Sequence, residues 1–235
     1  MRKGMQGPLA RSQNTPPPEF AYNPPTDNGL EILHHDDDLL VLSKPSGLLS
    51  VSGKAENHKD SLETRAQKEF PDARIVHRLD RGTSGVFVMA LNANAHRHLG
   101  LQFEKRQTSK TYIALVSGLV AKDEGTIDLA LRTDWYNRPK QMVDKLLGRE
   151  AVTHWKVKQR GIDFTRMELK PETGRSHQLR VHMMELGHPI VGDTFYASSD
   201  IASKSDRLML HAEQLELHHP ANGERIAFVA SCPFD

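Results

Sequence analysis

Short apolar runs separated by polar turns dominate the chain from about residue 30 onward, and they predict β-strands. The segments 30–33, 39–42 and 86–91 are runs of this kind, and 112–116 is apolar on both faces, as expected of a central strand. Further strands are predicted near 75–76, 151–158, 164–170, 208–210, 215–217 and 226–229.

Three segments predict helices instead. Residues 61–70 fit a short helix, and Asn92 can cap a helix that runs to about Arg106 with one apolar face. A third helix is expected to start at Ser176 as its N-cap and to stop at Gly187. Because helices do not alternate regularly with strands, we expect an α+β fold with a mixed, largely antiparallel sheet and flanking helices.

The first residues differ in composition from the rest. Six of the 13 prolines lie within the first 25 positions. Proline cannot donate to a strand ladder, and the segment has little apolar surface to bury. We therefore expect residues 1–26 to form a flexible tail and 27–235 to form a single domain, which agrees with the chain length of 235 residues.

The distribution of charge along the chain is more informative than the net charge. The 31 basic and 30 acidic residues leave a net charge of +1, which by itself argues against a polyanion-binding protein. However, segment 74–112 holds seven basic against two acidic residues, and 132–149 holds five against two. Such clusters are typical of phosphate-backbone contacts, although a solvated mixed-charge surface is the alternative.

Cysteine content and hydropathy limit the setting of the protein. Cys232 is the only cysteine, so an intramolecular disulfide and a cysteine-based zinc site are both excluded. No apolar run approaches the roughly 18 residues that span a membrane, and the N-terminus does not resemble a signal peptide. A cytoplasmic location is expected.

The loop 77–85 is the first candidate for chemistry. It places Asp80 between Arg78 and Arg81, and two glycines follow. Neighbouring arginines favour an ionised carboxylate, which could act as a nucleophile or a base. An ordinary Asp-Arg-Gly surface turn is the alternative, and spacing alone favours that alternative.

Two further segments carry candidate residues. Arg180 falls at the edge of the buried face of the third predicted helix, so it needs an anionic partner, for which Asp80 is a candidate. Arg175 at the start of that helix could hold a phosphate, and a solvent-facing basic helix start is the alternative. Tyr112 opens a strand, where its ring could stack on a base or simply fill the core.

Two groups of histidines have the composition of a metal site. The i, i+5 spacing of His177 and His182 is poor for a shared metal on one helix. Residues 34–38, His-His-Asp-Asp-Asp, resemble a metal cluster in composition, but adjacent side chains on an extended segment point to opposite faces. This segment is interpreted as a polar turn, and no metal site is expected.

Taken together, these motifs resemble those of the RluA-type pseudouridine synthases. The resemblance covers nearly the whole chain after residue 30 and includes 44–48 (KPSGL), 77–85 (HRLDRGTSG), 110–112 (KTY), 174–182 (GRSHQLRVH) and 187–193 (GHPIVGD). Within the family, segments 46–51 and 137–141 are similar to members of dual specificity for 23S ribosomal RNA and certain tRNAs. The Pro-rich start lies outside the motifs, and no N-terminal S4-like domain is expected.

The resemblance implies the pseudouridine synthase fold with a central RNA-binding cleft, and isomerisation of uridine to pseudouridine without a cofactor. By carry-over, Asp80 is the catalytic carboxylate, which attacks C1′ or removes a proton from C2′. Arg180 pairs with Asp80, Tyr112 stacks on the base and can assist the last proton removal, and Arg78 fills the space that the flipped base leaves. The remaining expected RNA contacts are Arg81, Arg138, Lys140, Arg175 and His177.

The expected partners are therefore RNA molecules, namely a 23S ribosomal RNA hairpin and a tRNA anticodon stem-loop. No membrane and no obligate protein partner is expected, and a monomer is the default. Two other classes of protein were weighed. A non-catalytic RNA-binding or ribosome-assembly protein has no need of a carboxylate among phosphate contacts. A metal-dependent nuclease needs clustered carboxylates, which the basic motifs lack.

Overall fold

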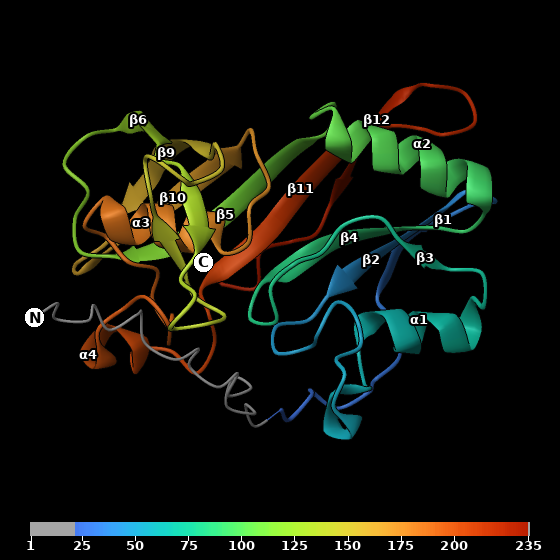
Figure 1. Ribbon diagram of the computed structural model, residues 1–235, viewed down its shortest axis with the longest axis horizontal. Coiled ribbons are helices and arrows are strands. Elements are labelled where there is room, and N and C mark those ends of the chain that lie inside the picture. The colour runs from blue at the N-terminus through green and yellow to red at the C-terminus, as the bar shows by residue number, and fades with distance from the viewer. Residues whose placement is uncertain (1–21, 235) are drawn as a thin grey trace, which may run out of the picture.

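A ten-stranded mixed sheet organises the protein, as a computed structural model that describes residues 22–234 shows (Figure 1). The strands from the first half of the chain are β1 (Ile32–His35), β2 (Leu39–Lys44), β3 (Arg74–Ile75), β4 (Ser84–Ala90) and β5 (Ser109–Ser117). Those from the second half are β6 (Glu124–Asp128), β9 (Val152–Arg160), β10 (Phe164–Pro171), β11 (Leu210–His218) and β12 (Arg225–Val229).

The strand order brings the two halves of the chain together at the centre of the sheet. It runs β1-β2-β4-β11-β5-β10-β9-β6, with β3 beside β4 and β12 beside β11. All these pairs are antiparallel except β4 and β11, which are parallel. The predicted α+β fold with a mixed, largely antiparallel sheet is therefore confirmed.

Two helices cover opposite faces of one half of the sheet. Alternate residues of β2 divide between them: Leu39 and Val41 pack with α2 (Ala93–Glu104), whereas Leu40 and Leu42 pack with α1 (Leu62–Glu69). Figure 1 shows α2 above and α1 below this half. Because both faces are covered, β4 is buried at every position, as its continuous apolar run predicts.

The third helix, α3 (Gln178–Glu185), packs on the other half of the sheet. Its residues Leu179 and Met183 join a core formed with strands β5, β9 and β10. The remaining elements are the 3₁₀ turn η1 (Glu56–His58), the short helix α4 (Ser199–Ala202), and a separate two-stranded arm of β7 (Leu131–Thr133) and β8 (Gln141–Val143).

Helix starts follow local chemistry in two of three cases. Ser61 caps α1 by accepting from the backbone N–H of Thr64, and Asn92 caps α2 by accepting from that of Ala95. The prediction of Ser176 as the third cap is wrong by one residue. His177 is the N-cap of α3 and adopts a left-handed conformation with φ 54°.

Other boundaries also differ from the sequence predictions. The first strand begins at Ile32, and the two short strands expected at 208–210 and 215–217 form one strand, β11. The polar residues between those runs keep the strand conformation because β11 pairs with neighbours on both sides, with an irregularity between Ala212 and Gln214. Strand β6 and helix α4 carried no sequence signal strong enough to predict.

The expected tail of residues 1–26 lies mainly outside the described residues. Its last part is fixed to the fold. The Tyr22 hydroxyl donates to the Asp60 carbonyl and accepts from the Leu49 N–H, and Arg65 donates to the Pro25 carbonyl. Tyr22 thus has a buried place that composition does not reveal. Within residues 22–234, helices of the length and apolarity needed to cross a membrane are absent.

Candidate active site

Asp80 lies on the loop between β3 and β4. A buried lysine forms hydrogen bonds to the backbone of this loop. Lys44, at the end of β2, is fully buried. Its ammonium group donates to the carbonyls of Pro45, Arg81 and Thr83 at 3.0, 3.1 and 2.7 Å. Burial lowers the pKa of Lys44 to about 7, while the charge of Asp80 opposes that shift. The 44–48 motif therefore shapes the loop that carries the carboxylate.

Two serines complete this support. Ser46 donates to the carbonyl of Gly82 at 2.6 Å, and Ser50 donates to the carbonyl of Leu79 while accepting from its N–H. Side-chain hydrogen bonds to backbone groups on both sides of Asp80 fix the path of the chain there. The carboxylate is thus presented by a rigid segment, as a reacting group needs.

The Asp80 carboxylate remains open to solvent on one side. Its side chain is 27% exposed, and Oδ2 lies 3.5 Å from Arg180 Nη1 and 4.0 Å from His177 Nε2. The structure thus brings Asp80 and Arg180 together. The Arg180 contact is long for a charge-assisted hydrogen bond, which leaves the carboxylate oxygen available to another group.

Arg180 has a closer partner than Asp80. Its Nε and Nη2 donate to the two carboxylate oxygens of Asp193 at 2.8 and 2.7 Å, and the Asp193 side chain is fully buried. Burial acts to lower the pKa of Arg180. The hydrogen bonds and charge of Asp193, together with the charge of Asp80, outweigh burial and raise the pKa of Arg180. Arg180 is therefore a permanent cation aimed at Asp80.

A buried glutamine orders the segment that leads into α3. Gln178 Oε1 accepts from the Thr173 hydroxyl at 2.7 Å and from the Arg175 N–H at 3.0 Å. Its amide donates to the Val152 carbonyl and the Thr153 hydroxyl. These bonds fix the backbone of residues 173–178, which line a cavity together with Asp80.

His177 and His182 have separate surroundings. The Nδ1 atom of His177 hydrogen-bonds the Tyr196 hydroxyl at 2.7 Å, and burial lowers the His177 pKa, which favours a neutral ring beside Asp80. His182 is buried and hydrogen-bonds Thr153 and the Leu129 carbonyl. The two histidines therefore differ in their hydrogen-bond partners and serve different parts of the fold.

Tyr112 reaches the same cavity from the sheet. It lies on β5, opposite Ala212 of β11 and Leu169 of β10, and lines the cavity together with Asp80. Burial, and then the negative charge of Asp80, raise the pKa of the Tyr112 phenol. The phenol therefore stays protonated and offers a neutral aromatic face.

A cleft of about 990 Å³ opens outward from this point. Its walls come from both halves of the chain and from the β7–β8 arm. Cationic side chains outnumber carboxylates on them: the cations are Arg78, Arg106, Lys110, Arg138, Arg149 and Arg175, and the carboxylates are Asp80, Glu104 and Glu172. Such a lining favours the binding of a polyanion above Asp80.

The predicted RNA contacts divide into two groups. Arg78, Arg138, Arg175 and His177 line the cleft. Arg81 and Lys140 are not among its lining residues. The Arg81 carbonyl accepts hydrogen bonds from the Lys44 ammonium group and the Gly47 N–H. The Lys140 carbonyl accepts one from the Asp134 N–H.

Two residues with structural importance for the site were not predicted as site residues. Lys44 and Asp193 both occur in the sequence motifs, but their partners lie far away in the chain. Lysine is rarely fully buried, so sequence gives no reason to place Lys44 beneath a loop. Among residues 22–234, the one group of three metal-ligating side chains lies outside the cleft, so the site lacks the clustered carboxylates of a metal-dependent nuclease.

Comparison with known proteins agrees with this geometry. Residues 38–185 match the family of RNA pseudouridylate synthases. The chain is 52% identical over 214 residues to the dual-specificity RNA pseudouridine synthase RluA of Escherichia coli strain K12, covering 91% of this chain and 98% of that protein. It is 48% identical to RluA of Vibrio parahaemolyticus, covering 91% and 87% of the two chains.

Solved structures give the same result. Human RNA pseudouridylate synthase domain containing 1 superposes with a TM-score of 0.77 at 30% identity, covering 91% of this chain and 87% of that one. Human RNA pseudouridylate synthase domain containing 4 gives 0.69 at 28% identity, covering 87% and 89%. The family that the motifs predicted is thereby confirmed: the chain belongs to the RNA pseudouridylate synthases, which are isomerases.

Proposed function

We propose that this enzyme isomerises one uridine in a 23S ribosomal RNA hairpin and one in a tRNA anticodon stem-loop, with Asp80 as its catalytic carboxylate. The observation that carries the proposal is the position of Asp80, open to solvent at the base of a cationic cleft and faced by Arg180. The dual specificity rests on the similarity to the RluA proteins, whose name states it.

The reaction needs an ionised carboxylate close to the ribose. It breaks the bond between C1′ and N1 of the uridine, rotates the base, and joins C5 to C1′. C5 then loses its proton and N1 gains one, so the product is an isomer of the substrate. Asp80 either attacks C1′ or removes a proton from C2′. Both routes start from the carboxylate form, and the cation of Arg180, fixed by Asp193, lies beside that carboxylate.

Tyr112 would hold the base while it turns. Its neutral ring beside Asp80 supports a stacking role, because an aromatic face accepts a base in several orientations. The raised pKa of the phenol argues against a standing phenolate. If Tyr112 takes the proton from C5, its own hydroxyl proton must leave in the same step.

Arg78 is placed to compensate for the removal of the base from its stack. It is exposed at the edge of the cavity, two residues from Asp80. A planar guanidinium can stack on the neighbouring bases and contact phosphates at the same time. Extraction of a loop uridine costs a few kcal/mol, which these contacts offset.

The β7–β8 arm would contact the RNA outside the catalytic cavity. Trp135 and Tyr136 are 61% and 95% exposed at its tip, and the Arg138 guanidinium lies 4.0 Å from the Trp135 ring centroid. Exposed aromatic side chains next to arginine suit unpaired bases and their phosphates. Lys140, although outside the cleft lining, lies on this arm and can add a phosphate contact, and so can Arg81 at the loop.

We further propose that residues 27–235 act as one catalytic domain, in keeping with the continuous sheet of residues 22–234. We also propose that the enzyme is a monomer and needs no obligate protein partner. A cytoplasmic location fits the proposed ribosomal and transfer RNA substrates.

The decisive experiment uses Asp80→Asn with two RNAs, a 23S hairpin and a tRNA anticodon stem-loop, each carrying tritium at C5 of uridine. We expect unchanged RNA affinity and no tritium release. Asp72→Asn changes an exposed carboxylate in the same way and should keep full activity. Tritium release by Asp80→Asn would exclude Asp80 as the catalytic group, and wild-type release from only one RNA would exclude dual specificity.

A further inference from the structure

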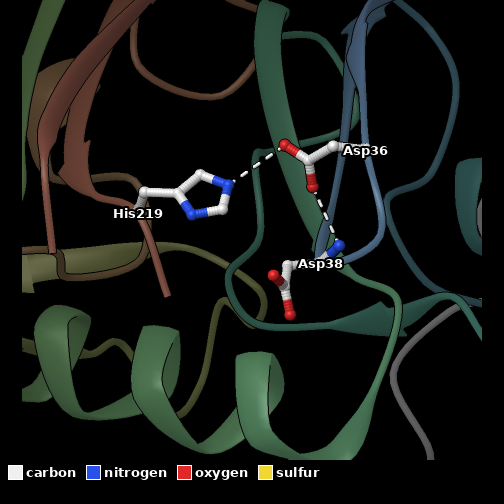
Figure 2. Close-up of side chains that lie close together, drawn as sticks. All are labelled: Asp36, Asp38 and His219. Atoms are coloured by element: carbon white, nitrogen blue, oxygen red, sulfur yellow. Dashed lines mark hydrogen bonds and ion pairs between the residues drawn. The ribbon is translucent and has the colours of Figure 1, made fainter. Parts of the chain in front are cut away.

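A second cluster of titratable side chains lies outside the RNA cleft. It joins the turn between β1 and β2 to the residue after β11, and none of its members lines the catalytic cavity. Figure 2 shows the His219 ring and the Asp36 carboxylate directed at each other, with the Asp38 side chain below them. One ligand atom from each lies within 4.8 Å of those of the other two.

The centre of the cluster is one oxygen of Asp36. His219 Nε2 lies 3.0 Å from Asp36 Oδ2, and His34 Nε2 lies 2.5 Å from the same oxygen. The other oxygen, Oδ1, is fixed by the backbone N–H groups of Asp38 and Leu39, both at 2.8 Å. The carboxylate is therefore held with Oδ2 directed at two imidazoles from distant parts of the chain.

The even-numbered residues of segment 34–38 gather on one side of the turn. His34, Asp36 and Asp38 are half-buried there, whereas His35 and Asp37 are exposed. The sequence interpretation as a polar turn considered only neighbours along the chain. It lacked His219, which the fold brings from 183 residues away.

We propose that Asp36, Asp38 and His219, with His34 as an additional donor, bind one divalent transition-metal ion of the zinc type. Imidazole nitrogen and carboxylate oxygen together form the usual ligand set for Zn²⁺, whereas Mg²⁺ and Ca²⁺ prefer oxygen ligands alone. Two imidazoles directed at one carboxylate oxygen distinguish this cluster from an ordinary acidic turn.

The outer contacts of the cluster are also suited to a metal. Asn92, the N-cap of α2, donates to Asp38 Oδ1 at 2.7 Å and to the Asp37 carbonyl. Such contacts orient a ligand carboxylate before a metal arrives. They also connect the cluster to a third element, so that a bound ion would tie the β1–β2 turn, the end of β11 and the start of α2 together.

Metal binding at His219 requires a change of ring tautomer. The Nδ1 atom of His219 accepts from the Ala221 N–H at 3.2 Å, so the neutral ring carries its proton on Nε2. A neutral ring that coordinates through Nε2 carries its proton on Nδ1, so coordination gives up this exposed hydrogen bond and the one between Nε2 and Asp36.

The test uses the untagged full-length protein, stripped with EDTA and titrated with ZnCl₂ in a calorimeter. We expect one equivalent of Zn²⁺ to bind and the thermal unfolding midpoint to rise with Zn²⁺ concentration, because a ligand of the native state stabilises it. MgCl₂ at the same concentrations should leave the midpoint unchanged. Absence of stoichiometric Zn²⁺ binding by the folded protein would overturn the proposal.

Matched variants locate the site. Asp36→Asn and His219→Gln should each weaken Zn²⁺ binding by at least about tenfold, whereas Asp37→Asn and His218→Gln make the same changes next to the cluster and should bind as the wild type does. Circular dichroism of each stripped variant separates ligand loss from unfolding. Equal Zn²⁺ affinity in His219→Gln and wild type would place the ion elsewhere. The proposal is independent of RNA modification, so its failure leaves the role of Asp80 intact.

Discussion

Arg180 is held more tightly by Asp193 than by Asp80. Two hydrogen bonds of 2.8 and 2.7 Å join it to the buried Asp193 carboxylate, whereas Asp80 lies 3.5 Å from its remaining nitrogen. The arginine therefore keeps its position whether or not Asp80 reacts. Asp193 is a positioning residue, because it acts on the site through Arg180.

Asp193→Asn tests this relationship. Asparagine keeps one oxygen for the backbone N–H groups of Phe195 and Tyr196 but replaces the other oxygen by a donor that faces Arg180. Loss of one partner of a buried ion pair should lower the free energy of unfolding by about 3–5 kcal/mol. In the variant that remains folded at low temperature, kcat should fall at least about tenfold with little change in KM.

The control for this prediction is Asp163→Asn, which removes an exposed partner of Lys204. Exposed ion pairs contribute about 0–1 kcal/mol, so stability and kcat should both stay near the wild-type values. Unchanged kcat in folded Asp193→Asn would show that Arg180 does not depend on Asp193 for its position.

Substitution of Tyr112 separates the ring from the hydroxyl group. Tyr112→Phe keeps the stacking face and should retain RNA affinity, whereas Tyr112→Leu should weaken binding of the flipped base by about 1–3 kcal/mol. Tritium release and RNA binding are measured for both variants. Equal RNA affinity of the Leu and Phe variants would contradict the stacking role. Loss of tritium release in Tyr112→Phe with RNA affinity retained would assign the last proton transfer to the hydroxyl.

The arm should contribute to RNA binding in two distinguishable ways. Trp135→Ala removes a stacking surface and should weaken binding without changing its salt dependence. Arg138→Gln removes a phosphate contact and should reduce the slope of log K against log salt by about 0.7–0.9. Filter binding at several salt concentrations measures both effects. Ile162→Ala, at an exposed apolar residue away from the cleft, should bind like wild type, and identical slopes for Arg138→Gln and wild type would contradict the phosphate contact.

His77 should make the protein sensitive to acid. Its ring stacks between Phe87 and Phe103, and Nε2 accepts from the Val88 N–H at 3.1 Å. Burial, and then the charge of Lys110, lower the pKa of His77 to about 3. The same histidine titrates near pH 6.5 in the unfolded state. Between pH 6.5 and about 3, the unfolded state therefore binds a proton at this residue and the native state does not. The free energy of unfolding consequently falls as the pH falls through this range.

The measurement for His77 is urea unfolding between pH 7 and 4, with wild type and His77→Gln compared at each pH. Glutamine keeps an acceptor but does not titrate in this range. The wild type should lose more stability than the variant over this interval. Parallel stability curves for the two proteins would show that His77 does not cause the acid sensitivity.

Features that depend on neighbouring residues could be predicted from sequence. The caps Ser61 and Asn92 and the buried strand β4 follow from local patterns, and the motifs indicated the family. The start of α3 was missed by one residue because the Gln178 side chain organises the preceding turn through residues of β9. No local pattern contains that information.

Features that depend on distant partners were out of reach. The sequence offers Asp80 as the partner of Arg180, and only the fold shows that Asp193 takes the two shorter bonds. The same holds for His219 beside Asp36, and for Lys44, whose acceptors are backbone carbonyls rather than side chains. Every residue has a backbone carbonyl, so the amino-acid sequence does not show which carbonyls accept such a bond.

The assembly of the site across the centre of the sheet has a consequence for the growing polypeptide. Asp80 precedes Arg180 by 100 residues, and Asp193 follows later still. A nascent chain therefore carries Asp80 before Arg180 has been synthesised. The contact between the two side chains can form only after β5, β10 and β11 have joined the strands of the first half in one sheet.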